Sequence, residues 1–407
     1  MKSPSLVVSW FIILLFPLYS FPWVVYRMYH LERTSYLQFA FFMGLVGMLY
    51  PPFGDFYRYM LDYNAYKGLD FDSFLLLALI EFDYLLSFLI YALGCLNIPC
   101  DISRFIFNAF GFYLYSKLYY HIVNDNQALL KGKERLRWFI VFFSFSFWGF
   151  MFRYGLATIL FAYGTYFIIY RSQKRYWFLI ILSVLCHFSF VIFATALLVS
   201  RFIHFSPKRN YFYIISALVL IFGIVNNGVF WDLKLIGGDL IDRYDGYLDA
   251  DDMGEYAKRF SWKALVWQKI GYMTMFLLYC YYASYKVMGR RREVTLLNYL
   301  VIFSMLSSPF SVIFGRFFGV TSQFLKIFSM LHFNCGFVKA RRYLSLLFIL
   351  AMISLLTQFW GKRRELSVSD MSLFATQTSV QILFHTYPDT WVDKNVRADG
   401  GVLKYDD

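Results

Sequence analysis

The stretch at residues 176–199 reads YWFLIILSVLCHFSFVIFATALLV, with no charged side chain and a single imidazole, His187. A helix needs about 20 apolar residues to cross the hydrocarbon core of a bilayer, so a run of this length predicts a membrane segment. Basic clusters flank the run at both ends, at 171–175 and 201–209. Because basic loops are retained on the cytoplasmic side, the pattern points to a re-entrant hairpin, with a single crossing as the alternative.

Similar apolar runs recur along all 407 residues, of which 59% are hydrophobic and only 16% charged. A soluble protein of this composition could not cover its own surface. We therefore predict an all-α, polytopic transmembrane helical bundle with roughly ten to twelve spans. The first run follows a single lysine and lacks a small-residue cleavage site, which favours a retained span over a signal peptide. The expected spans are 5–25, 36–53, 74–97, 104–123, 138–152, 155–170, 176–199, 211–230, 263–285, 295–313, 318–336 and 343–360.

The loops between these runs alternate in charge, and this alternation predicts the topology. Basic clusters mark cytoplasmic turns, whereas the acidic loops 54–73 and 231–263 mark the extracytoplasmic side. The second loop carries eight acidic against five basic residues. Residues 74–123 break the alternation, because two apolar runs there join an acidic loop to a basic one. We therefore expect one of these two runs not to cross fully. The basic clusters are Lys131/Lys133/Arg135/Arg137, Arg171/Lys174/Arg175, Arg201/Lys208/Arg209, Lys286/Arg290/Arg291/Arg292 and Lys339/Arg341/Arg342.

Composition and missing motifs exclude several other classes of protein. The net charge of +13 is carried by the cytoplasmic clusters, so it does not indicate nucleic-acid binding. The five cysteines form no CxxC or CxxH pair, so neither a disulfide framework nor a metal site is expected. No Walker A, GxGxxG, GxSxG or HExxH motif is present, and no cofactor is expected. No linker divides the chain, so we expect one transmembrane domain at 1–360 and a polar C-terminal tail at 361–407.

Two isolated arginines are the first candidates for function. Arg153 and Arg316 each stand alone between apolar runs, and the charge alternation places both on the side of the acidic loops. This placement opposes the positive-inside preference. A guanidinium can bind phosphate through a bidentate fork, so the two residues are candidates for anion binding. The alternative is that both are interfacial anchors whose charged ends reach water.

His187 and the segment 54–66 are the next candidates. Ionisable groups at membrane depth are costly and mark functional sites by default, although a lone histidine on an apolar face is more often a packed, hydrogen-bonded residue. Segment 54–66 mixes tyrosines with Asp62 and Arg58, which suits sugar binding and equally suits a solvated loop. Glu81 and Asp83 form a further acidic pair, a weak metal signal. At i and i+2 on a helix they face different directions, whereas in an extended segment both could reach one metal or one substrate.

The order of these motifs resembles that of the EpsG/Wzy-like family of bacterial polysaccharide polymerases. That family shows an arginine before Gly-x-Asp-Tyr-x-x-Tyr, then Arg-Gln-x-Leu-Ala, then His-x-Ser, then a late arginine beside aromatics. Two positions differ here, with Met60 in place of the glycine and Tyr154 in place of the glutamine. The matching segments are Arg58 with Asp62-Tyr63-Asn64-Ala65-Tyr66, Arg153-Tyr154-Gly155-Leu156-Ala157, His187-Phe188-Ser189 and Arg316-Phe317-Phe318.

The resemblance implies a multi-pass enzyme of the bacterial inner membrane, active in O-antigen or exopolysaccharide synthesis. It would transfer a growing glycan from undecaprenyl pyrophosphate onto a new lipid-linked repeat unit, without a metal. Arg153 and Arg316 would bind the pyrophosphates. His187 would be the first candidate for base or acceptor contact, with Asp62 the second. Arg58, Tyr63 and Tyr66 would bind sugar. The partners would be lipid-linked oligosaccharides and the bilayer, with a chain-length regulator as an optional protein partner.

Two other functions stay open at the level of sequence. A GT-C-type lipid-linked glycosyltransferase would use Glu81 and Asp83 with a divalent cation. A flippase for lipid-linked repeat units is the alternative from a different class, although the large acidic loop at 231–263 counts against it.

Overall fold

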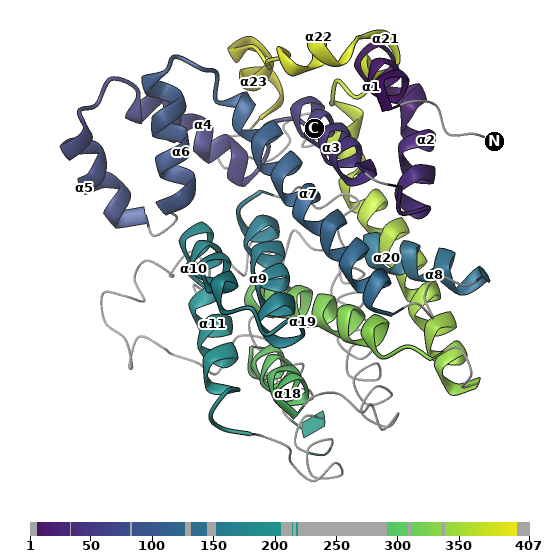
Figure 1. The fold of residues 1–407 in the computed structure, drawn as a ribbon. Helices are drawn as coiled ribbons and strands as arrows, with labels where there is room; N and C mark the ends of the chain where they lie inside the picture. Colours follow the sequence, from purple (N-terminus) through teal and green to yellow (C-terminus); the bar gives the residue numbers. More distant parts are fainter. Residues whose placement is uncertain are drawn as a thin grey trace. The chain divides into compact units, whose positions relative to one another are not determined.

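The computed structural model describes residues 6–32, 34–81, 84–126, 132–144, 152–204, 291–307, 311–334 and 338–396, together with Ile214, Ala217 and Leu218. Throughout this part of the chain the regular structure is helical, which confirms the all-α prediction (Figure 1). The expected spans 211–230 and 263–285 and the acidic loop 231–263 lie outside the described residues, apart from the three single positions. The number of spans therefore stays a prediction.

The chain divides into two compact units, one of residues 1–194 and 344–407, the other of residues 195–343. Helix α11 (Phe190–Val199) and helix α20 (Val338–Ser367) run from one unit into the other, and the second unit also contains α18 (Arg291–Leu306) and α19 (Ser311–Leu331). The first unit contains α1 (Leu6–Leu15), α2 (Pro17–Tyr29), α3 (Ser35–Leu49), α4 (Asp55–Tyr66), α5 (Phe71–Glu81), α6 (Tyr84–Cys95), α7 (Asp101–Asp125), α8 (Gly132–Phe143), α9 (Arg153–Ile169), the 3-10 turn η2 (Lys174–Tyr176), α10 (Trp177–Cys186), α21 (Leu373–Thr376), α22 (Ser379–Leu383) and α23 (Asp389–Asn395).

Helices α3 and α7 form the centre of the first unit, and glycines let them approach closely. A Cβ added at Gly47 would lie 2.4 Å from the Asn108 amide nitrogen and 3.0 Å from the Arg104 carbonyl oxygen. A Cβ at Gly44 would lie 2.7 Å from the Phe105 ring. Only glycine leaves room for this approach. Gly44 and Gly47 therefore allow the end of α3 to pack closely against the beginning of α7.

Two of the expected spans are divided into half-length helices. One of them, 74–97, forms parts of α5 and α6. The Phe74 ring of α5 stacks on Tyr91 of α6, with centroids 4.0 Å apart, and the Phe71 ring also contacts Tyr91 and Phe88. The two helices are therefore antiparallel. Helices of 11 and 12 residues extend only about 17 Å at 1.5 Å per residue, roughly half of a bilayer core. Such a hairpin fits the expectation that one of the two apolar runs in 74–123 does not cross fully.

Residues 176–199 show the same device, with α10 and α11 separated by His187, Phe188 and Ser189. Helix α10 runs antiparallel to α9, since Ile180 lies against Gly164 and Cys186 reaches Arg153. After the break, the ring contacts return along α9. Phe190 touches Tyr154 and Phe161, and Phe193 touches Phe161. The chain therefore reverses at His187, which is the arrangement expected of a re-entrant hairpin.

One helix among the described residues is both long and apolar enough to cross a membrane by itself, at Ala340–Trp360 within α20. Ser35–Leu49, Tyr84–Cys95 and Phe190–Val199 are shorter apolar helices. In the second unit, α18 and α19 pair through polar side chains. The hydroxyls of Ser304 and Thr321 lie 2.7 Å apart, and Glu293 lies 2.8 Å from His332.

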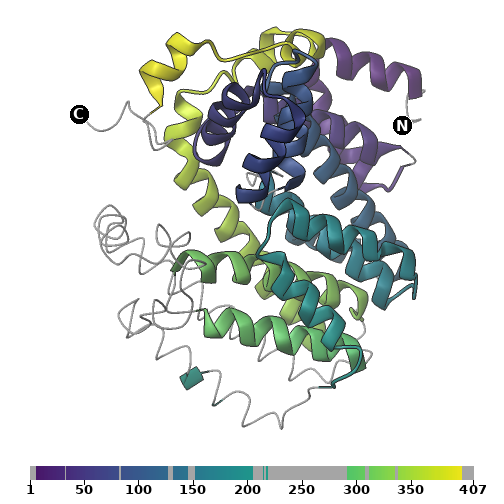
Figure 2. The ribbon, with the colours of Figure 1, turned by 90° about the vertical axis from the view of Figure 1, so that its left-hand side faces the viewer.

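The C-terminal tail is a packed part of the first unit as far as residue 396. Helix α22 begins with a capping box in which Thr378 and Gln381 satisfy each other's backbone groups. The Ser379 hydroxyl donates to the Ile13 carbonyl at 2.7 Å, and Tyr387 donates to the Leu49 carbonyl at 2.6 Å. Figures 1 and 2 both show the yellow helices α21–α23 across one end of this unit. The tail therefore covers the end where α3 stops and α7 begins.

Candidate active site

The candidate segment 54–66 forms helix α4, and the helical period gives its candidate residues different degrees of exposure. Gly54 precedes the helix with φ +60°, a conformation that glycine adopts without strain. Arg58 is exposed, while Asp62 and Tyr63 are half-buried. The Tyr63 hydroxyl donates to the Ile98 carbonyl at 2.9 Å. Tyr66 is only 3% exposed and packs edge-on against Phe74, so its ring faces the core of the unit.

Arg153 is the first residue of α9, directly after Phe152 in extended conformation. The Phe152 ring contacts three other rings, at 5.5 Å from Phe56, 5.3 Å from Tyr59 and 5.2 Å from Phe107. The half-buried Arg153 side chain points to the same aromatic group, with Nη1 3.4 Å from the Tyr59 hydroxyl. The α4 motif and the arginine motif of α9 are thus neighbours in space.

His187 lies at the tip of the α10–α11 hairpin and is 8% exposed. Its ring meets Tyr154 edge-on, with centroids 5.2 Å apart. The preceding residue, Cys186, places its Sγ 3.2 Å from the Arg153 carbonyl oxygen. The hairpin therefore places His187 at the N-terminal end of α9, next to its first residue, Arg153.

The hydrogen bonds of His187 define its tautomer. The backbone N–H of Ser189 donates to Nδ1 at 3.3 Å, and the Ser189 hydroxyl lies 2.9 Å from the same nitrogen. A backbone N–H can only donate, so Nδ1 is an acceptor and the neutral ring carries its proton on Nε2. In this state Nε2 is a donor and not an acceptor, so contact with a phosphate or sugar oxygen fits this nitrogen better than proton abstraction does.

A buried ion pair beside this group was not singled out by the sequence reasoning. Arg104 in the first turn of α7 is 3% exposed, and its guanidinium bonds to the Asp101 carboxylate and to the Tyr50 carbonyl. The guanidinium also lies over the Phe56 ring, 4.6 Å from its centroid. Arg104 opens an apolar run just as Arg153 does, and the same criterion of an arginine at the start of a span would have found it.

The remaining candidates are placed less completely. Arg316 is half-buried on α19 and belongs to the second unit, so a cleft shared with Arg153 and His187 stays a prediction for this residue. Asp83 and the side chain of Glu81 lie outside the described residues. Among the residues that the structure describes, no group of three or more His, Cys, Asp or Glu side chains could hold a metal ion.

Together, these features define an all-helical protein with apolar half-length hairpins and an arginine–histidine–aromatic site at one end of its larger unit. The chain belongs to the EpsG family, whose family model matches residues 32–369. Membership indicates a polysaccharide polymerase-like function in a generally membrane-associated family. No curated protein and no solved structure matches the chain.

Proposed function

We propose that this protein is a metal-independent polymerase of lipid-linked repeat units in the bacterial inner membrane, acting in O-antigen or exopolysaccharide synthesis. A hydroxyl oxygen at the non-reducing end of the new repeat unit forms a bond to the anomeric carbon of the growing glycan. The bond between that carbon and the pyrophosphate oxygen breaks, and undecaprenyl pyrophosphate leaves with the electron pair. The hydroxyl proton passes to a base.

One observation carries the proposal, namely that three motifs from separate segments meet at one end of α9. Arg153 lies beside Tyr59 of α4, and the residue after it, Tyr154, touches His187 at the hairpin tip. Proximity of this kind is what a transfer reaction needs, since a cation for the leaving group and a contact for the acceptor must act on one carbon. These motifs are separated by about 30 to 90 positions in the sequence, so their meeting is not a local effect.

Arg153 would stabilise the leaving pyrophosphate. Charge develops on that group as the glycosidic bond breaks, and preorganised cations act where charge develops. A hydrogen bond to a charged partner is worth about 1.5–3 kcal/mol, and a guanidinium can form two. Arg316 is proposed as the second pyrophosphate ligand, on the strength of its isolated position and its place in the family pattern.

The proposed base is Asp62, and His187 is proposed as the acceptor contact. The sequence ranked them in the opposite order for the base. The Ser189 contacts put the His187 proton on Nε2, which favours donation. Asp62 lies three residues after Tyr59 on α4, so the two side chains occupy neighbouring positions on the helix surface, and Tyr59 contacts Arg153.

Sugar binding is proposed for the exposed part of α4. Arg58 is exposed and Tyr63 is half-buried, so both can contact a glycan. Tyr66 was proposed with them, but its burial against Phe74 gives it a supporting role for the helix. Lipid-linked oligosaccharides and the bilayer remain the proposed partners, with a chain-length regulator as an optional one.

The experiment that tests this function is a deletion strain examined for surface glycan. A polymerase defect leaves single repeat units outside the cell, whereas a flippase defect leaves the lipid-linked repeat untranslocated. Activity that persists in EDTA supports a metal-independent polymerase, and activity lost in EDTA supports a GT-C-type enzyme that uses Glu81 and Asp83.

A further inference from the structure

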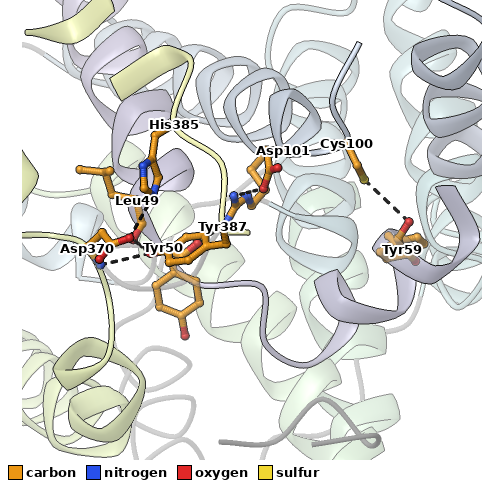
Figure 3. A network of polar contacts seen from close by, with 9 residues as sticks. Leu49, Tyr50, Tyr59, Cys100, Asp101, Asp370, His385 and Tyr387 are labelled. Carbon is orange, nitrogen blue, oxygen red and sulfur yellow. Dashed lines mark hydrogen bonds and ion pairs between the residues drawn. The ribbon is translucent and has the colours of Figure 1, made fainter. Parts of the chain in front are cut away.

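The C-terminal segment reaches the candidate site through Tyr387. This residue is 3% exposed. Its hydroxyl donates to the Leu49 carbonyl at 2.6 Å and accepts the Asp370 backbone N–H at 3.1 Å. Figure 3 shows Tyr387 next to Leu49, Asp370 and His385. Tyr387 therefore ties the tail to the end of α3, more than 300 positions away in the sequence.

Arg104 lies between the tail and α4. Its guanidinium is 5.4 Å from the centroid of the Tyr387 ring and 4.6 Å from that of Phe56. Aromatic faces attract a cation, most strongly where water is excluded. The Asp101 carboxylate neutralises the charge of this arginine, so Arg104 is suited to holding the two rings and not to binding a further anion.

A continuous set of contacts leads from the tail to Arg153. Tyr387 contacts Arg104, Arg104 contacts Phe56, and the Phe56 ring packs edge-on against Phe152 at 5.5 Å. Phe152 immediately precedes Arg153, the first residue of α9. Two packed side chains, Arg104 and Phe56, therefore connect Tyr387 to the residue that directly precedes Arg153.

The hydrophobic contacts of the tail reinforce the same connection. Phe53, Tyr387, Val392 and Val396 form a buried cluster, against which Tyr57, Met60, Val368 and Trp391 pack. Tyr57 and Met60 belong to α4, so the tail rests directly on the motif helix. The tail cluster and Arg104 thus contact neighbouring residues of the same helix, Tyr57 and Met60 in one case and Phe56 in the other.

We propose that Tyr387 and Arg104 are positioning residues that hold α4 and Phe152 so that Arg153 meets the leaving pyrophosphate. This inference rests on the proposed function, because that function gives Arg153 its role. Tyr387 does not touch substrate in this account. It acts through Arg104 and Phe56, and the C-terminal segment is part of the catalytic unit.

The test compares Tyr387→Leu, which removes the ring over Arg104, with Tyr387→Phe, which keeps the ring and loses the hydroxyl. Phe384→Leu is the matched control, since Phe384 lies in the same segment and is 75% exposed. Polymerisation of purified lipid-linked repeat units is measured per folded protein. We expect Tyr387→Leu to lower kcat by about tenfold to a hundredfold with little change in KM, because small displacements of a catalytic group have effects of this size. Tyr387→Phe should lose less, and Phe384→Leu should match the wild type.

A double-mutant comparison with Arg153 distinguishes the positioning role of Tyr387 from a role in stability alone. In an Arg153→Lys background, Tyr387→Leu should cause almost no further loss, because residues that act through one another are non-additive. Equal fold-losses in both backgrounds, or a Tyr387→Leu enzyme with wild-type kcat, would overturn the inference while leaving the proposed function intact. If Tyr387→Leu does not fold, the fold-losses of Tyr387→Phe and Arg104→Lys are compared in the same two backgrounds.

A second measurement does not depend on polymerisation. Modification of Arg153 by phenylglyoxal, followed by peptide mass spectrometry, should rise several-fold in Tyr387→Leu and stay unchanged in Phe384→Leu. Unchanged reactivity of Arg153 in Tyr387→Leu would overturn the inference by itself. A wild-type protein that forms no polymer would instead overturn the proposed function, and the reactivity of Arg153 would still decide the positioning role.

Discussion

The Tyr154 ring meets the His187 imidazole edge-on, with centroids 5.2 Å apart and planes at 83°. Tyr154 follows Arg153, and the residue before His187 places its thiol 3.2 Å from the Arg153 carbonyl oxygen. The α10–α11 hairpin, whose helices are each too short to cross a bilayer, thus places His187 at the N-terminal end of α9, beside Arg153. The pairing joins the second and third motifs of the family pattern.

The tautomer of His187 predicts which substitutions retain activity. A glutamine places an amide N–H close to the position of Nε2–H, so His187→Gln should keep a measurable part of polymer formation and His187→Ala should lose nearly all of it. Asp62→Asn should abolish activity, because the amide cannot accept a proton as a base. Initial rates of polymer formation check this. Equal loss in His187→Gln and His187→Ala, together with an active Asp62→Asn, would reassign the base to His187.

Close packing of α3 on α7 predicts a stability effect at Gly47. A Cβ there would meet the Asn108 amide at 2.4 Å and the Arg104 carbonyl at 3.0 Å. Overpacking of this kind costs about 1–3 kcal/mol, so Gly47→Ala should lower the unfolding temperature in detergent. Gly315→Ala is the matched control, because a Cβ at Gly315 meets nothing within 4 Å. An unchanged unfolding temperature in Gly47→Ala would show that the two helices separate without cost.

The C-terminal segment should loosen in acid. Burial lowers the pKa of His385 below its ordinary value of 6.5, and the charge of Arg104 adds to this effect. The carboxylates of Asp370 and Asp101 act in the opposite direction without reversing it. The folded state therefore favours the neutral imidazole. The resulting stability is complete above pH 6.5 and is lost as the pH falls from there through the lowered pKa.

Hydrogen exchange of residues 379–396 measures this loosening. Exchange corrected for its intrinsic pH dependence should be faster at pH 5.5 than at pH 7.5. His385→Gln cannot titrate and should remove the difference. Equal protection of the wild type at both values would contradict the assignment of His385 as the titrating group.

The packing of the tail on α4 predicts that both lie on one side of the membrane. Single cysteines at exposed positions, Arg58→Cys and Phe384→Cys, should react with an impermeant maleimide added outside intact cells. Lys133→Cys, at an exposed position in the first turn of α8, should react only after permeabilisation. The background replaces the native cysteines. Labelling of positions 58 and 384 from opposite sides would be incompatible with the docked tail.

The sequence predicted the features that depend on composition and on local charge. Apolar runs became helices, because burial of apolar side chains and backbone hydrogen bonding act locally. Isolation among apolar residues singled out Arg153 as a candidate, and basic residues at both ends of 176–199 favoured a re-entrant hairpin over a single crossing. In each case the signal lies within about 25 positions of the residue concerned.

Contacts between residues far apart in the sequence could not be predicted from composition and local charge. Arg104 opens an apolar run as Arg153 does, but its contacts with Phe56 and Tyr387 join distant segments, and only the fold shows them. The tail was expected only to be more polar than the spans, and composition does not reveal that Tyr387 reaches Leu49, 338 positions earlier. Phe53 and Trp391 are unremarkable separately, and only the fold brings their rings to 6.0 Å.

The central claim is that this chain joins lipid-linked repeat units with the help of Arg153. The most direct test incubates purified protein with undecaprenyl-pyrophosphate-linked repeat units and resolves the products by chain length. Wild-type protein should give a ladder of multiple repeats and release one undecaprenyl pyrophosphate for each bond formed. Arg153→Ala should leave single repeats at normal protein level, and Arg153→Lys should recover little, because a point charge does not reproduce the guanidinium fork. Single repeats left unchanged by the wild type, or a full ladder from Arg153→Ala, would contradict the account.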